Sequence, residues 1–217
     1  MEDQINKKYQ VAIDELNRAK KFFLDRFCDD DRVKNANVFI TIQTSARRNN
    51  LGHFWAEKWV SDSSAADEDK EYYHEINICA EYMNRPAQDI YETLLHELAH
   101  LYNNILELPD CNDVQYHNKN FKKAAEMFGL IVDRFPGKGW ALTSLSEEAH
   151  SAIAALEPKA DALNFHRVSQ PKIQQESKYI NISLKKSEWD DFFKEKLDEL
   201  GLEKPKELIL QLLEELN

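Results

Sequence analysis

Residues 92 to 103 read Glu-Thr-Leu-Leu-His-Glu-Leu-Ala-His-Leu-Tyr-Asn and contain the pattern H-E-x-x-H. Apolar residues recur around this pattern at helical spacing, at Ile90, Leu94, Leu98, Leu101 and Ile105. At about 100° per residue these side chains form one stripe, whereas His96 and His100 lie together on roughly the opposite side. The stretch therefore predicts an amphipathic helix that begins near Pro86, packs by one face and presents two imidazoles on the other.

The spacing of the two histidines is that of a metal site. Residues four apart are neighbours on a helix, so His96 and His100 can bind one Zn²⁺ at about 2.0 to 2.1 Å. Glu97 lies beside them and is predicted to be the general base that activates a water molecule. The alternative is a solvent-facing pair of histidines beside a surface glutamate. The strong periodicity of the helix favours the metal site.

A catalytic zinc site needs a third protein ligand. His117 is the best candidate, because it follows a Pro-Asp-Cys-Asn-Asp loop that can turn the chain back toward His100. Cys111, within that loop, is a competing ligand as a thiolate, although a structural cysteine is the simpler interpretation. We expect the remaining histidines to be ordinary polar positions: His53, His74, His150 and His166.

A ligating histidine normally donates its other ring N–H to a carboxylate or carbonyl oxygen. Five polar residues are placed for this role, on the histidine side of the helix or in the loop before His117: Asp89, Thr93, Asn103, Asp110 and Asp113. The sequence does not select among them. Tyr116 is a candidate donor to an oxyanion, with a packing role as the simpler interpretation.

The stretch from residue 38 to about residue 145 resembles the SprT-like zinc metallopeptidases, which are related to the Spartan proteases that degrade DNA–protein crosslinks. The segments that carry the resemblance are residues 40–43, 51–53, 75–79, 92–103, 116–121 and 139–140. The resemblance implies zinc held by His96, His100 and His117, with Glu97 activating water in a small zincin-type α+β domain. Relatives often have glycine after the third histidine, where this chain has Asn118. Many also carry a four-cysteine zinc ribbon, which the absence of cysteine beyond Cys111 excludes.

The rest of the N-terminal region predicts an α+β domain over residues 1–160, with a three-stranded sheet packed against helices. Alternating or β-branched stretches predict strands at 38–42, 52–60 and 73–79, with an exposed acidic loop between the last two. Apolar periodicity predicts helices at 2–27, 121–128 and 146–156, and residues 130–145 are β-like.

The C-terminal region has a different composition. Residues 161–177 read as a linker, and 178–217 resemble a ribbon-helix-helix domain, with one strand and two helices. Such a segment cannot bury its apolar surface alone, so we expect it to dimerise or dock on the first domain. Asn181, Ser183 and Lys185 would face outward and can contact DNA. The segment has 7 Lys against 10 Asp+Glu, so dimerisation alone is equally expected.

Charge and composition limit the class of protein. The chain has 28 Lys+Arg against 39 Asp+Glu, a net charge of −11, which opposes broad affinity for nucleic acids or anionic membranes. It has neither a signal-peptide pattern nor an apolar run of about 18 residues, and its three cysteines are widely spaced. We therefore expect a cytoplasmic zinc endopeptidase without membrane partners, with DNA-bound proteins as candidate substrates. The alternative is a non-catalytic, zinc-stabilised DNA-binding regulator.

Overall fold

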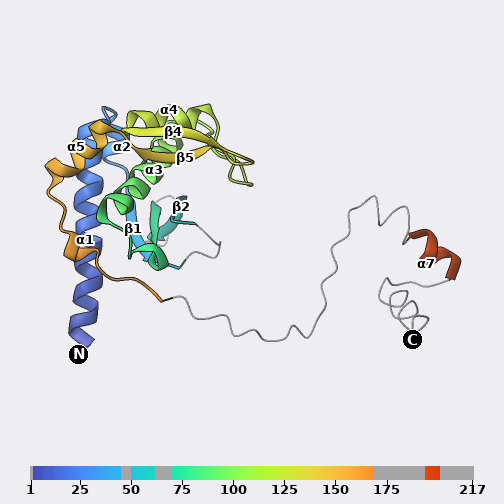
Figure 1. Ribbon diagram of the computed structural model, residues 1–217, viewed down its shortest axis with the longest axis horizontal. Helices are drawn as coiled ribbons and strands as arrows, with labels where there is room; N and C mark the ends of the chain where they lie inside the picture. The colour runs from blue at the N-terminus through green and yellow to red at the C-terminus, as the bar shows by residue number, and fades with distance from the viewer. Residues whose placement is uncertain (1, 45–49, 62–69, 169–193, 201–217) are drawn as a thin grey trace. The chain divides into compact units, whose positions relative to one another are not determined.

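The computed structural model describes residues 2–44, 50–61, 70–168 and 194–200 of the chain. The chain divides into two compact units, residues 1–169 and 170–217. The first unit contains a three-stranded sheet, a β-hairpin and several helices (Figure 1). A mixed α and β domain with a small sheet was predicted, and this architecture is confirmed.

The first helix, α1 (Glu2–Phe27), packs on the core by a stripe of small and large apolar residues. Its buried side chains are Ala12, Leu16, Ala19, Phe23 and Leu24. Of the large apolar residues at helical spacing in this helix, Leu16 and Phe23 are fully buried, whereas Tyr9 is 40% exposed. Two alanines take the central positions of the contact, because a small side chain lets the helix approach its neighbours closely. A short helix, α2 (Asp31–Lys34), follows and was not predicted.

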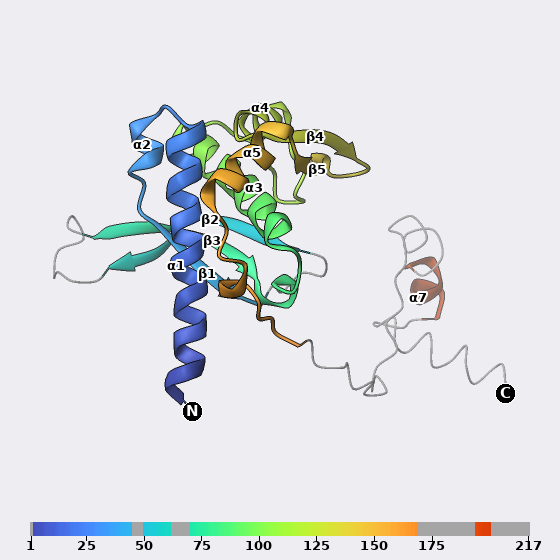
Figure 2. The same cartoon turned by 60° about the vertical axis from the view of Figure 1, so that its left-hand side comes forward.

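The three-stranded sheet has the order β1-β3-β2, and all three strands were predicted. The central strand β3 (Glu71–Cys79) runs parallel to β1 (Val38–Gln43) and antiparallel to β2 (Gly52–Ser61). One face buries Ile40, Ile42, Ile76 and Ile78 in the core with residues of α1 and the central helix. The opposite face is polar and aromatic, with several exposed side chains. In Figure 2 the far ends of β2 and β3 extend beyond α1.

The central helix α3 (Ala87–Ile105) carries the H-E-x-x-H pattern and follows the 3-10 turn η2 (Ala80–Tyr82). Pro86 is its N-cap and not its first helical residue, and the Pro86 carbonyl accepts the backbone N–H groups of Asp89 and Ile90. The predicted apolar stripe is confirmed, since Ile90, Leu94, Leu98 and Leu101 are fully buried and Ile105 packs against the core. The opposite face is therefore available for a functional site.

After α3 the chain forms a second layer beside the helix. It contains α4 (Lys119–Met127), the antiparallel hairpin of β4 (Leu130–Phe135) and β5 (Gly139–Leu145), and α5 (Glu147–Leu156). Residues 130–145 were predicted only as one β-like stretch, and the turn at Gly137, with φ +74°, divides them into two strands. Ser146 caps α5 by accepting the Ala149 N–H.

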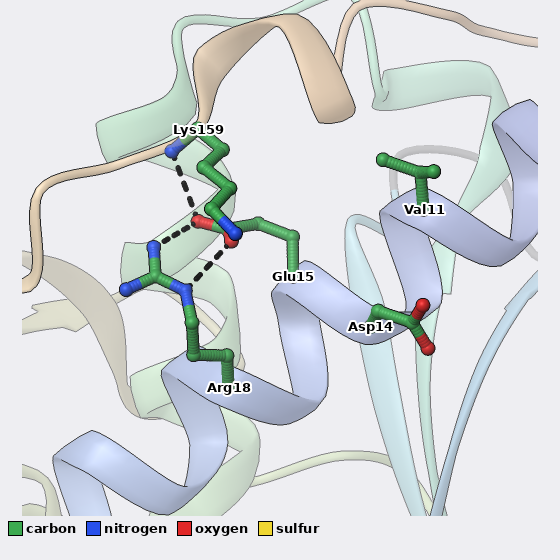
Figure 3. Close-up of a pocket in the computed structure, with 5 residues that line it drawn as sticks. All are labelled: Val11, Asp14, Glu15, Arg18 and Lys159. Atoms are coloured by element: carbon green, nitrogen blue, oxygen red, sulfur yellow. Dashed lines mark hydrogen bonds and ion pairs between the residues drawn. The ribbon is translucent and has the colours of Figure 1, made fainter.

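A polar cluster around Glu15 joins α1 to α3 and to the segment after α5, and Figure 3 shows its members on α1 and at Lys159. The Glu15 carboxylate accepts hydrogen bonds from Arg18 Nε and Nη2, at 2.8 and 2.7 Å, and from the Tyr91 hydroxyl at 2.7 Å. The backbone N–H of Lys159 also donates to it, at 3.0 Å. Arg18 in turn donates to the Leu156 carbonyl. The cluster therefore fixes α3, which carries the site, against two other parts of the fold.

The first unit continues past residue 160, where the sequence predicted the linker 161–177 to begin. In the 3-10 turn η3 (Ala160–Ala162) the side chain of Ala162 is buried, as is that of the following Leu163, so this segment packs on the first unit. In the second unit the structure describes one helix, α7 (Lys194–Leu200), within a stretch predicted to be helical. Asn181, Ser183 and Lys185 lie outside the described residues. No helix in the described part of the chain combines the length and apolarity needed to cross a membrane.

Candidate metal centre

The structure brings His96, His100 and His117 together. One ring nitrogen from each lies within 4.8 Å of the others, so the three can hold one metal ion. His100 Nε2 and His117 Nε2 are 3.2 Å apart. Two ligands bound at 2.0 to 2.1 Å in tetrahedral geometry are separated by about 3.3 Å, so this spacing suits zinc. The three histidines that the sequence predicts as ligands therefore lie in one cluster.

Two features of the chain hold His117 beside α3. Cys111 and His117 form an isolated antiparallel bridge, and His117 also bridges to Gly139, so the loop is fixed on both sides. Gly139 has φ +68°, and a Cβ there would lie 2.2 Å from the His117 carbonyl oxygen. Only glycine therefore allows β5 to approach the ligand segment this closely.

The residue after the third histidine, Asn118, has a clear local role. Its side chain accepts the N–H groups of Asn120 and Phe121 and so caps α4. Its amide also donates to the Pro109 carbonyl at 2.8 Å, which closes the loop before His117. Asn118 therefore anchors the turn into α4 directly after His117.

Phe121 forms an apolar floor beneath the three imidazoles. Its ring centroid lies 4.6 Å from those of His96 and His100 and 4.5 Å from that of His117. Its side chain is fully buried, so the histidines are supported on one side by a fixed aromatic ring. An apolar wall of this kind limits solvent access and keeps the ring nitrogens directed toward one another.

Among the five polar candidates for orienting a ligand, the structure selects Asp110 together with Asn103. Asp110 Oδ2 lies 2.8 Å from His100 Nδ1 and accepts a hydrogen bond from Asn103 Nδ2 at 3.1 Å. A carboxylate can only accept, so Nδ1 carries the proton and Nε2 presents its lone pair to the cluster. Thr93 instead contacts Arg85 and the Asp89 carbonyl, and Asp113 is exposed.

Burial and neighbouring charges shift the pKa values of the three histidines in different directions. Burial, with the charge of His100, lowers the pKa of His117 to about 4, and burial also lowers that of His96 well below its usual value. Burial alone would lower the pKa of His100, but the hydrogen bond to Asp110 and the charge of Glu97 raise it. Two of the three rings are thus neutral near pH 7, which is the form that binds metals.

Glu97 is buried on the same helix, with 5% of its surface exposed. Its carboxylate accepts the backbone N–H of Phe54 on β2, and burial raises its pKa to about 7. A Cβ at Gly52 would lie 3.0 Å from Glu97 Oε1 and 2.7 Å from the Thr93 methyl group, so glycine there makes room for the carboxylate. The sequence did not predict this contact between β2 and Glu97, because it depends on how the strand packs on α3.

Other candidate ligands lie elsewhere or have other partners. The thiol of Cys111 donates to the Asn112 carbonyl, and the cysteine is not among the described groups placed to share a metal ion. His74 Nδ1 accepts the Glu57 N–H, and His53 packs edge-on against Trp55. The remaining two, His150 and His166, are exposed.

One comparison with known proteins identifies the family. The model of the SprT-like family matches residues 16–138, which covers more than half of the chain and includes all three histidines. No curated protein and no solved structure gave a match. The resemblance seen in the sequence is therefore confirmed, and the chain belongs to the SprT-like family.

Proposed function

We propose that this protein is a zinc-dependent endopeptidase, in which His96, His100 and His117 hold Zn²⁺ and Glu97 is the general base. The support is threefold. The chain belongs to the SprT-like family, its three imidazoles lie within 4.8 Å of one another, and neutral imidazole is a preferred zinc ligand. Of metals that imidazole binds, zinc is the one that combines tetrahedral geometry with hydrolytic chemistry.

The observation that carries the proposal is the environment of Glu97. A glutamate with 5% exposure normally has a cationic partner, but no Lys or Arg of the described residues forms an ion pair with this one. Its pKa is raised to about 7, which is the range of an efficient general base. A purely structural metal site has no need of such a carboxylate.

Zinc in this site would supply Lewis acidity, lowering the pKa of water and polarising the scissile carbonyl. Glu97 takes a proton from the attacking water and passes it to the leaving amine. The Phe54 N–H donates to the Glu97 carboxylate and so fixes its position. Asp110 holds the His100 ring with Nε2 directed at the cluster.

The test is digestion of protein substrates by zinc-loaded wild type and by Glu97→Gln. The amide keeps the size of the side chain but cannot take a proton, so we expect turnover to fall by about 10²- to 10⁴-fold with metal content unchanged. Glu126→Gln, a change at an exposed glutamate of α4, is the matched control and should retain activity. Equal cleavage by Glu97→Gln and wild type would refute the catalytic role.

We propose DNA-bound proteins as one substrate class, with residues 178–217 as a dimerising or DNA-binding segment through Asn181, Ser183 and Lys185. The support is the strand-helix-helix pattern of the sequence and the resemblance to proteases of DNA–protein crosslinks. The same digestion with and without DNA tests the first part. Light scattering tests dimerisation, and a full-length monomer at micromolar concentration would refute it.

A further inference from the structure

The central part of α3 reaches solvent along a single line of side chains. From Ile90 to Leu101 nine residues are buried, and the other three, Glu92, His96 and His100, are partly exposed. These three are spaced four apart, so they follow one another along the helix with about 5 to 6 Å between successive Cβ atoms. The two histidines belong to the candidate metal centre. Glu92 is therefore the third residue of α3 that a polypeptide meets when it approaches the metal.

A hydrogen bond fixes the Glu92 side chain beside the site. Thr143 on β5 donates its hydroxyl to Glu92 Oε1 at 3.0 Å. The same strand supports the third candidate ligand, because Gly139 bridges to His117. An ionised carboxylate offers about four lone-pair sites, and Thr143 is the one donor to Glu92 in the described part of the chain. The carboxylate is thus held in place and keeps an oxygen that can meet a bound polypeptide.

The charge of Glu92 has no direct counterion among the described residues, since none of them forms an ion pair with it. Burial raises the pKa of Glu92 and the charge of Asp89 raises it further, whereas the Thr143 hydrogen bond and the charge of Arg85 lower it. Arg85 donates its hydrogen bonds to uncharged acceptors instead. Asp89 and Arg85 have opposite charges, so together with Glu92 they leave this part of the site negative.

A half-buried carboxylate of this kind discriminates mainly against like charge. Water screens it less than it screens a surface group, so a second charge nearby interacts with it more strongly. Desolvation opposes any charged side chain brought beside it. For an acidic side chain the repulsion adds to this cost, whereas for a basic one the attraction is largely offset by it. An uncharged donor, such as a backbone N–H or a serine hydroxyl, can bind the carboxylate without that cost.

We propose that Glu92 is a specificity-determining residue that excludes Asp and Glu side chains from the substrate positions beside the scissile bond. This inference rests on the endopeptidase function proposed above and names the substrates that the site accepts. An extended polypeptide advances about 3.3 Å per residue, so the step from His96 to Glu92 corresponds to about two substrate residues. The exclusion therefore concerns one or two positions on one side of the cleaved bond, and segments without a carboxylate there are the preferred substrates.

The test is digestion of a proteome-derived peptide library by the zinc-loaded, full-length protein. Mass spectrometry identifies the residues that flank each cleaved bond. For wild type we expect Asp and Glu to be depleted by about tenfold at one or two flanking positions, relative to their frequency in the library, as repulsion between two carboxylates predicts. Glu92→Gln keeps the size of the side chain and an acceptor for Thr143 but removes the charge. Its depletion at these positions should fall below about twofold.

Two controls and a second measurement complete the test. Glu126→Gln removes one exposed carboxylate from α4 and should keep the wild-type profile. Elemental analysis should find equal zinc in Glu92→Gln and wild type, which excludes an effect through the metal. Two synthetic peptides that differ only by Gln or Glu at the depleted position are then compared. Wild type should cleave the Gln peptide with a kcat/KM about tenfold higher, and this comparison does not require the variant to fold.

Three results would overturn the inference. They are a wild-type profile in which Asp and Glu are as frequent beside the cleaved bond as in the library, a depletion that Glu92→Gln leaves unchanged, and loss of zinc from Glu92→Gln. The last would assign Glu92 to the support of the metal centre. A library that wild type does not cleave at all refutes the proposed function, and the inference falls with it. The two failures are distinguishable, because the exclusion is judged only on bonds that wild type cleaves.

Discussion

Two buried glutamates, Glu15 on α1 and Glu97 on α3, lie in contrasting environments. Glu15 is 2% exposed and lies in a closed cluster, where Arg18 and the Lys159 backbone donate to its oxygens (Figure 3). The Tyr91 hydroxyl donates to it as well. Glu97 is 5% exposed and accepts one backbone N–H, from Phe54. Burial raises the pKa of both groups, but the hydrogen bonds from Arg18, Lys159 and Tyr91 reverse this for Glu15, whose pKa is lowered. That of Glu97 rises to about 7.

The contrast separates a structural cluster from a functional one. The two oxygens of Glu15 accept hydrogen bonds from within the fold. The role of this cluster is therefore structural: it holds α1, α3 and the segment after α5 together. Glu97 has no comparable set of donors, since no Lys or Arg of the described residues forms an ion pair with it. A buried carboxylate without a cationic partner costs stability, so it is retained where it serves a function.

The largest expected effect is on metal content. His117→Ala removes one of three protein ligands, so we expect zinc to fall from about one ion per chain to near none after dialysis. His96→Ala and His100→Ala should do the same. Elemental analysis of the purified proteins measures this. Full zinc occupancy in His117→Ala would remove that residue from the site and reopen the case for Cys111 or a carboxylate.

The second effect is on stability and should leave the metal site unaffected. Glu15→Ala leaves the Tyr91 hydroxyl and the Arg18 guanidinium without their acceptor, so we expect a loss of about 3 kcal/mol in the free energy of unfolding. Zinc content should not change. Urea denaturation measures the loss. Asp14→Ala, at an exposed carboxylate on the same helix, is the matched control and should change stability by less than about 0.5 kcal/mol.

A third change tests the support of the metal ligands. Asp110→Asn keeps the size of the side chain but replaces the charged acceptor of His100 Nδ1, so zinc affinity should fall by about 10- to 100-fold. Competition with a chromogenic chelator measures the affinity. Asp113→Asn changes an exposed carboxylate in the same loop and should have little effect. Equal affinities for the two variants would show that Asp110 does not position the ligand.

The metal site could be predicted because its determinants are local. The periodicity around His96 and His100 defines both the helix and the face that carries the ligands, and His117 follows after a short loop. Asp110 could not be chosen from the sequence over Asp89 or its other rivals, since the choice depends on how the loop folds back. Local spacing therefore found the ligands but not the groups that orient them.

The other features join residues distant in the sequence. Glu15, Tyr91 and Lys159 come from three separate elements, and no local pattern links them. The boundary near residue 160 was placed by composition, whereas Leu163 is held in the unit by tertiary packing.

The smallest expected effect is in the pH dependence of the closed cluster. The pKa of Glu15 is lower in the folded protein than its usual value, so the folded state binds a proton there less readily than the unfolded state. The stabilisation is therefore complete above the ordinary glutamate pKa of about 4.3 and is lost as the pH falls through the lower, folded value. Glu15→Gln cannot titrate. The stability gap between wild type and Glu15→Gln should accordingly be larger at pH 7 than at pH 4. Urea denaturation of the metal-free proteins at both pH values measures the gap, because removing zinc excludes the protonation of its ligands. A gap that widened on acidification would mean that the carboxylate of Glu15 is not stabilised in its charged form, and the contrast with Glu97 would lose its basis.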